Sequence, residues 1–173
     1  MQRRHLLKNG ALASCLLAIR PHTFFPSAPQ ERTGSNPPYL APQLIRKFIK
    51  AAHRDMETVK ALLKEYPTLL NAAYDWKGGD FETALGAASH VGHKVMAQYL
   101  MDQGAQFNIF TACLFGRMDI VKPVLDFSPD TLYAKGPHGF TLLHHAKRGG
   151  DEALEVKEYL LRLGAKEMKV LLY

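Results

Sequence analysis

The sequence predicts an all-α fold: a solenoid of about four helix–turn–helix units that begins near residue 40. Helical spacing is the first observation, because apolar residues along 83–91 and Lys94–Asp102 recur so that each segment buries one face. Internal repetition is the second, because residues 56–60 (METVK) and 118–122 (MDIVK) match at a distance of 62 residues. These helices are too short to be stable alone in water, so the pairs must stack on one another.

The best-defined unit spans residues 82–108. Gly92 fits a tight turn between its two helices, and Gly104 fits a left-handed helix end, because glycine has no Cβ to clash there. The pattern Thr-x-Leu-x-x-Ala-x-x-x-Gly-His, followed by Tyr-Leu, Gly-Ala and Asn, resembles an ankyrin repeat. The resemblance implies stacked helix pairs with loops or hairpins projecting at right angles, binding of other proteins, and no chemistry shared across the family.

The other units repeat this pattern with departures. The first has helices expected at 43–53 and 56–66 and lacks the turn glycine. The third carries Pro123 inside its second helix, where the loss of one backbone hydrogen bond should bend or shorten the helix. Thr141-x-Leu143-His144 in the fourth is similar to the Thr-Pro-Leu-His tetrapeptide of the family. The unit boundaries are expected at about 41–72, 80–108, 108–132 and 139–168, with the apolar tail 170–173 covering the open end of the last unit.

Residues 1–28 predict an export signal. A basic start precedes an uncharged apolar run at 11–19, and small residues follow at Ser27-Ala28. The run is too short to span a bilayer, which needs about 20 residues. One group of residues resembles the twin-arginine motif, which implies export of a folded protein to the periplasm or another extracytoplasmic space: Arg3, Arg4, Leu6, Leu7 and Lys8.

The fate of this leader has three alternatives. Cleavage after Ala28, lipidation of Cys15 and an uncleaved tether all fit the residues, and the last two would hold the protein at a membrane. Residues 29–39 are rich in proline and polar residues, which predicts a linker. If the leader is removed, Cys113 has no disulfide partner within the chain and is expected to be a buried small hydrophobe.

The charge does not favour a nucleic-acid partner. The chain has a net charge of +6, but residues 1–28 hold four basic residues and no acidic one. The remainder therefore carries 18 basic against 16 acidic residues. Nucleic-acid-binding domains show a clustered basic stripe, which this sequence lacks.

Two loops are expected to project from the units, the first at residues 74–81 and the second at 133–140, each with aromatic residues beside a glycine-rich tip. Almost no loop separates the second and third units, because Asn108 ends one and begins the next. We therefore predict a gap in the row of loops, which is either a pocket for a protrusion of a partner or an interrupted row.

Aromatic residues of these loops are candidates for contact with a partner, since Tyr and Trp are enriched at interface hot spots. Trp76 is expected to be the most exposed of them; the alternative is that the aromatic rings pack back onto the helices. The predicted protein-binding residues are Tyr74, Trp76, Lys77, Phe81, Tyr133 and His138.

No motif indicates catalysis or a cofactor. The sequence lacks Gly-x-Ser-x-Gly, a phosphate-binding glycine loop and the common zinc spacings. His144 is expected to be structural, as in the family, and His93 structural or at the surface. The Gly92 turn separates His90 from His93, so a shared metal geometry is not assured. Three carboxylates of the first loop and its flank are expected to be solvated: Asp75, Asp80 and Glu82.

The sequence as a whole therefore predicts a non-catalytic, exported module, without cofactor or metal, that binds another protein. Two alternatives stay open. One is a structural accessory that stabilises an exported enzyme, and the other is an enzyme or metal-binding protein built on the histidines and the carboxylates of the loops.

Overall fold

The computed structural model describes residues 39–173, so the predicted export signal, the lipidation site and nearly all of the linker lie outside the described residues. The described part is mainly helical, which agrees with the predicted all-α class. None of its helices is both long and apolar enough to cross a bilayer. Its α-helices are α1 Pro42–Ala52, α2 Met56–Glu65, α3 Ala84–Val91, α4 Lys94–Asp102, α5 Ile109–Leu114, α6 Met118–Phe127, α7 Leu142–Arg148 and α8 Leu154–Arg162.

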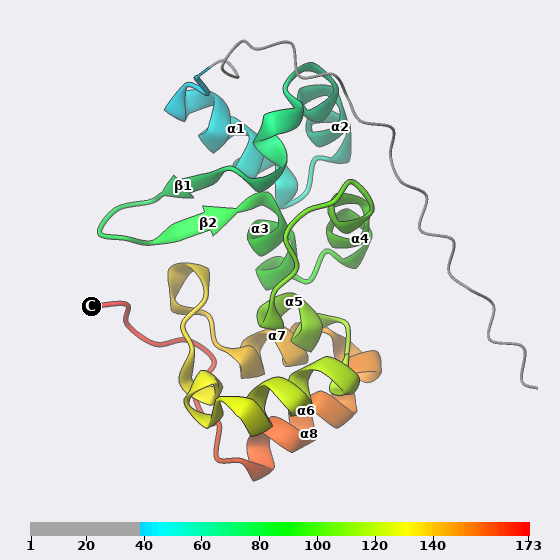
Figure 1. The fold of residues 1–173 in the computed structure, drawn as a ribbon, viewed down its shortest axis with the longest axis vertical. Helices are drawn as coiled ribbons and strands as arrows, with labels where there is room; N and C mark the ends of the chain where they lie inside the picture. The colour runs from blue at the N-terminus through cyan, green and yellow to red at the C-terminus, as the bar shows by residue number, and fades with distance from the viewer. Residues whose placement is uncertain (1–38) are drawn as a thin grey trace, which may run out of the picture. The chain divides into compact units, whose positions relative to one another are not determined.

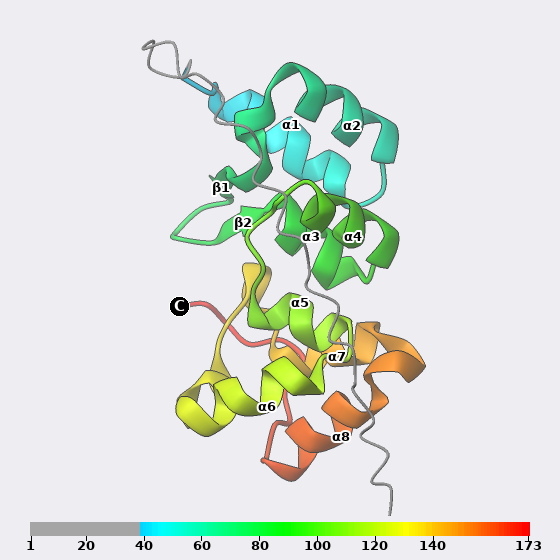
Figure 2. The same ribbon diagram turned by 45° about the vertical axis from the view of Figure 1, so that its right-hand side comes forward.

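Consecutive helices pack as pairs: α1 with α2, α3 with α4, α5 with α6, and α7 with α8 (Figure 1). The first helix of each pair also contacts the first helix of the next, in the order α1, α3, α5, α7 (Figure 2). Apolar side chains between the helices form two buried groups, and α5 joins them, because Leu114 belongs to the first group and Ala112 to the second.

Side-chain caps explain where several helices begin. Asp55, Thr83, Asn108 and Thr141 each precede a helix and accept a hydrogen bond from the backbone N–H three residues on. Thr83 was expected inside a helix; as the cap it moves the start of α3 to residue 84. The predicted bounds of α4 are confirmed.

The two expected turn glycines are confirmed. Gly92 has φ +80° and Gly104 has φ +93°, a region that residues with a Cβ rarely adopt. The two similar sequence segments that start at Pro67 and Pro129 both form short 3₁₀ helices, in which Leu69 and Leu132 are buried. Pro123 does not end its helix, since α6 continues to Phe127.

The C-terminal tail differs from the prediction that residues 170–173 cover the end of the last unit. Val170 N–H donates to the carbonyl of Gly139 at 2.9 Å, and Lys135 Nζ donates to that of Leu171 at 2.8 Å. The tail therefore runs along the segment before α7 (red in Figure 1), whose backbone groups lack helix partners and are satisfied this way. Leu171 and Tyr173 stay exposed.

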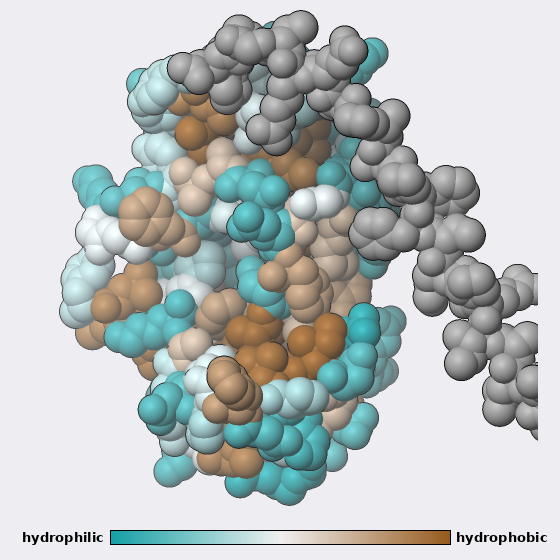
Figure 3. Space-filling model, in the orientation of Figure 1, coloured by the Kyte–Doolittle hydropathy of each residue, from teal (hydrophilic) through white to brown (hydrophobic). Residues whose placement is uncertain are grey.

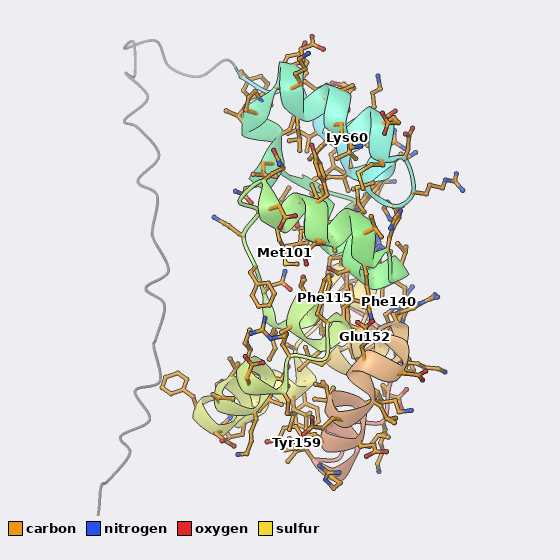
Figure 4. The ribbon with its side chains drawn as sticks, turned by 90° about the vertical axis from the view of Figure 1, so that its right-hand side faces the viewer. Lys60, Met101, Phe115, Phe140, Glu152 and Tyr159 are labelled. Carbon is orange, nitrogen blue, oxygen red and sulfur yellow. The ribbon has the colours of Figure 1, made fainter. Side chains whose placement is uncertain are left out.

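The side with α2 and α4 carries contacts between segments far apart in the sequence (Figure 4). Lys94 Nζ donates to Glu152 Oε2 at 2.8 Å and to the carbonyl of Gly149 at 2.6 Å, which ties the start of α4 to the segment between α7 and α8. Met101 on α4 and Phe115 after α5 border a cavity of about 400 Å³.

Candidate functional site

The first projecting loop is a β-hairpin of β1 Ala73–Asp75 and β2 Phe81–Thr83, with Tyr74 opposite Glu82. Asp75 Oδ1 accepts hydrogen bonds from the backbone N–H groups of Lys77 and Gly79, which fixes the tip. Successive strand residues face opposite sides. Phe81 is accordingly 61% exposed and Glu82 only 1% exposed. The expectation that Glu82 is solvated is therefore wrong, and strand alternation is the physical reason.

The buried carboxylate of Glu82 lies among aromatic and imidazole groups. Its Oε2 accepts a hydrogen bond from Trp76 Nε1–H at 2.7 Å. His90 Nε2 lies 2.8 Å from Oε1, but not at a hydrogen-bonding angle, and His53 Nε2 lies 3.9 Å from the same oxygen. Within the described residues Oε1 therefore has no hydrogen-bond donor.

Two histidines of this site are oriented by acceptors on their other nitrogen. His53 Nδ1 lies 3.0 Å from the carbonyl of Ile49, and His138 Nδ1 lies 2.7 Å from Asp80 Oδ2. A neutral imidazole that donates from Nδ1 has an unprotonated Nε2. The free Nε2 of His53 lies 3.2 Å from that of His90, and the Nε2 of His138 lies 3.5 Å from Glu82 Oε2. We call these four residues, His53, Glu82, His90 and His138, the His–Glu cluster.

The backbone of His138 is also held in an unusual conformation. Its φ is +58°, in the left-handed region, and Asp80 Oδ1 accepts its backbone N–H at 2.8 Å. Asp80 thus fixes the second projecting loop to the first through two hydrogen bonds. Beside the cluster, His53, Trp76 and His138 border a cavity of about 540 Å³, here called the Trp76 cavity; Lys50, Arg54 and Val91 complete its lining.

A second cavity, of about 350 Å³, lies at the predicted gap in the row of loops. Asn108 borders it between the first hairpin and the segment 135–137. We call it the gap cavity; its lining residues are Gly79, Asp80, Phe81, Thr83, Gly86, Asn108, Phe110, Lys135, Gly136, Pro137, His145 and Leu172.

His145 is the buried polar residue of the gap cavity. Its Nδ1 donates to the carbonyl of Thr141 at 2.7 Å, and its Nε2 has no partner within the described residues. Burial lowers the pKa of His145 to about 4, although the bond to Thr141 opposes this. The ring is therefore neutral near pH 7, and Nε2 is a buried acceptor without a donor.

The predicted protein-binding residues divide into two groups. Phe81, Tyr133 and Lys77 are exposed. Tyr74, Trp76 and His138 are partly buried. The expectation that Trp76 is the most exposed anchor is wrong, because its N–H is bonded to Glu82 and its ring packs on Tyr74, with centroids 5.0 Å apart.

Other sequence expectations concern residues outside the two sites. His144 Nε2 donates to the carbonyl of His90 at 2.8 Å, which is a structural link between α7 and α3, and burial lowers the pKa of His144. His93 caps α4 by accepting the N–H of Met96. Cys113 is buried, and burial raises the pKa of its thiol to about 12, so it is an unreactive core residue.

Sequence reasoning kept open a metal-binding protein built on the histidines, but it did not show which of them meet Glu82 in the His–Glu cluster, and it assigned no role to His145. The four cluster residues come from the end of α1, from β2, from α3 and from the second loop, so no short spacing connects them. The one available signal was the alternation in β2, which places Glu82 on the face opposite Phe81.

No protein-family model and no curated protein matches the chain. The function is therefore argued from the gap cavity and the His–Glu cluster.

Proposed function

We propose that this chain is an ankyrin-type repeat protein that binds another protein through the gap cavity. The paired helices, the contacts of α1, α3, α5 and α7 in order, and the two equivalent 3₁₀ segments support a repeat architecture. The hairpin, which projects from the helices beside α3 (Figure 1), agrees with the projecting loops that the resemblance implies.

The observation that carries the proposal is the unpartnered Nε2 of His145, a fully buried ring in the wall of a cavity at the expected gap. A buried acceptor without a donor costs about 1–3 kcal/mol, and a partner that supplies the donor recovers this cost. Because His145 is fully buried, a donor from a partner reaches its Nε2 only when a side chain of the cavity lining moves aside.

Apolar surface surrounds the position of His145. Phe110 lies against His145 with ring centroids 5.1 Å apart, and Phe81 and Leu172 also line the cavity. Figure 3 shows hydrophobic areas separated by hydrophilic ones on the drawn face of the molecule. Aromatic side chains are enriched at protein–protein interfaces, so Phe81 and Phe110 favour a protein as the occupant.

The occupant that fits is a side chain or turn of a partner protein that carries an N–H or O–H donor on an apolar stem. An N-terminal twin-arginine signal would place the protein and its partner outside the cytoplasm, or at a membrane if the leader is retained or lipidated. No catalytic step is assigned to the gap cavity.

Affinity capture with matched variants of the full chain tests this proposal. Phe81→Ala removes the exposed ring at the rim, and His145→Asn removes the Nε2 acceptor while its amide can still donate to the Thr141 carbonyl. Phe127→Ala is the control, because Phe127 is 92% exposed and does not line the gap cavity. We expect wild type and Phe127→Ala to recover the same polypeptide from the extracytoplasmic fraction. Phe81→Ala and His145→Asn should each recover at least about tenfold less of it.

Equal recovery by all the folded variants would refute binding through the gap cavity. A folded wild-type protein that recovers nothing specific would refute partner binding altogether. If the recovered polypeptide is an enzyme that loses stability when this chain is deleted, the protein is a structural accessory of that enzyme.

A further inference from the structure

We propose that the His–Glu cluster binds a divalent transition-metal ion, with zinc as the best fit, through His53 Nε2, His90 Nε2 and Glu82 Oε1. None of these three ligand residues lines the gap cavity. The metal site goes beyond the proposed binding of a partner and stands or falls independently of it.

The donor atoms have the spacing of a metal site. Their separations are 3.2 Å between the two Nε2 atoms, 2.8 Å from His90 to Glu82, and 3.9 Å from His53 to Glu82. The point in the plane of these three atoms that is equidistant from them lies about 2.0 Å from each, which is the length of zinc–nitrogen and zinc–oxygen bonds. Ligands of a tetrahedral zinc ion lie ~3.3 Å apart, so tetrahedral binding requires His53 Nε2 to move closer to Glu82 Oε1 by about 0.6 Å.

The protonation pattern leaves lone pairs that need a cation. Glu82 Oε1 is buried and has no hydrogen-bond donor, although its other oxygen is held by Trp76. A buried carboxylate is costly unless it is hydrogen-bonded, paired or binds a metal, and the imidazoles around Glu82 act as ion-pair partners only when they are protonated. Binding an ion through both Nε2 atoms, which lie 3.2 Å apart, requires that His90 also carries its proton on Nδ1.

Outer contacts orient the ligands as they do in known metal sites. Ile49 accepts from His53 Nδ1, which fixes the tautomer whose Nε2 can bind an ion. Trp76 N–H holds Oε2, so Oε1 is the oxygen directed at the two imidazoles. His138 approaches Oε2 rather than Oε1, and Asp80 anchors its other nitrogen. His138 therefore orients the carboxylate and is not one of the three ligands.

The composition and access of the site favour zinc. Two imidazoles and one carboxylate form a common ligand set for zinc ions that keep a fourth position for water or another ligand. His53 borders the Trp76 cavity, and its side chain is 26% exposed. An ion can thus enter from that cavity, and its fourth position would face the same space.

The test is metal binding by the full chain after it has been stripped with a chelator. Zinc is titrated by calorimetry and by competition with a chromophoric chelator, and cobalt gives the visible spectrum of the coordination geometry. His53→Ala removes a partly exposed ligand, and Glu82→Gln keeps the size of the side chain and an oxygen that can accept from Trp76. His93→Asn is the control, because it removes an imidazole outside the cluster and keeps a good N-cap residue for α4.

We expect one zinc ion per wild-type chain, the same affinity in His93→Asn, and a loss of at least about 100-fold in His53→Ala and Glu82→Gln. Cobalt should give the intense visible bands of four-coordinate geometry in wild type and lose them in both variants. Circular dichroism identifies any variant that fails to fold, and His53→Ala alone then decides. The proposal is overturned if folded wild type binds no stoichiometric zinc, or if folded His53→Ala binds it as tightly as His93→Asn does.

Discussion

Acidification should destabilise this protein through His145, the buried histidine of the gap cavity. Burial lowers the pKa of His145 in the folded state to about 4, from an ordinary value of 6.5. As pH falls below about 6.5, the unfolded chain takes up the proton and the folded chain does not. Stability contributed by the neutral ring is therefore full above pH 6.5 and is lost as pH falls toward 4.

The free energy of unfolding that His145 contributes is 1.36 kcal/mol for each unit by which its pKa differs between the folded and unfolded chains, which gives about 3 kcal/mol in all. Between pH 7 and pH 5 the loss is about 2 kcal/mol, because part of the titration lies lower. With a urea dependence of about 2 kcal/mol per molar, the unfolding midpoint should fall by about 1 M.

Urea unfolding followed by circular dichroism at pH 7 and pH 5 measures this loss. His145→Asn is the matched variant, because asparagine does not titrate and can still donate to the carbonyl of Thr141. The loss of stability between the two pH values should be smaller in this variant by about 2 kcal/mol. If wild type and His145→Asn lose the same stability, His145 is not the buried neutral group that the structure describes.

The remaining predictions concern stability as well, and urea unfolding measures each. Gly116→Ala should lower the free energy of unfolding by at least about 2 kcal/mol more than Gly150→Ala does. Both glycines have φ near +65°, but a Cβ at Gly116 would lie 2.0 Å from the carbonyl oxygen of Glu152, whereas a Cβ at Gly150 meets nothing within 4 Å. Equal losses in the two variants would contradict this packing. Pro123→Ala should raise stability by about 1–3 kcal/mol, because it restores an N–H inside α6 at an exposed position, and an unchanged midpoint would show that the helix does not miss that bond. Zinc at 100 times its dissociation constant should add about 2.7 kcal/mol to wild type and nothing to His53→Ala, and an equal gain in both would place the ion elsewhere.

Local structure was the part of the fold that the sequence could predict. Helical spacing and the turn residues determine α4 and the left-handed glycines, because these features depend on neighbours within a few positions. The tail at residues 170–173 was misplaced for the opposite reason. Its backbone partners at Gly139 and Lys135 lie some thirty residues earlier in the chain, and no local pattern reveals them.

The candidate sites show the same division. A gap at Asn108 could be predicted, because the absence of a loop is visible in the sequence. The burial of Glu82 and the half-burial of Trp76 were missed, because the two side chains bond to each other only once the hairpin has formed. The position of Glu82 beside a glycine-rich tip suggested that its side chain is exposed to solvent. Its position in β2 instead directs the side chain to the buried face of the hairpin.

Site-specific photo-crosslinking in the native host tests most directly that the gap cavity is a protein-binding site. A photoreactive phenylalanine analogue replaces Phe81 at the rim of the cavity or, in a separate control protein, Phe127 on α6. Both side chains are exposed, and Phe127 is the more exposed of the two, so a product at position 81 alone does not result from greater exposure. We expect the analogue at position 81 to crosslink to one polypeptide, and the analogue at position 127 to give no such product. The product at position 81 should disappear when the same protein also carries His145→Asn. The same products at both positions, or none at position 81, would contradict the account.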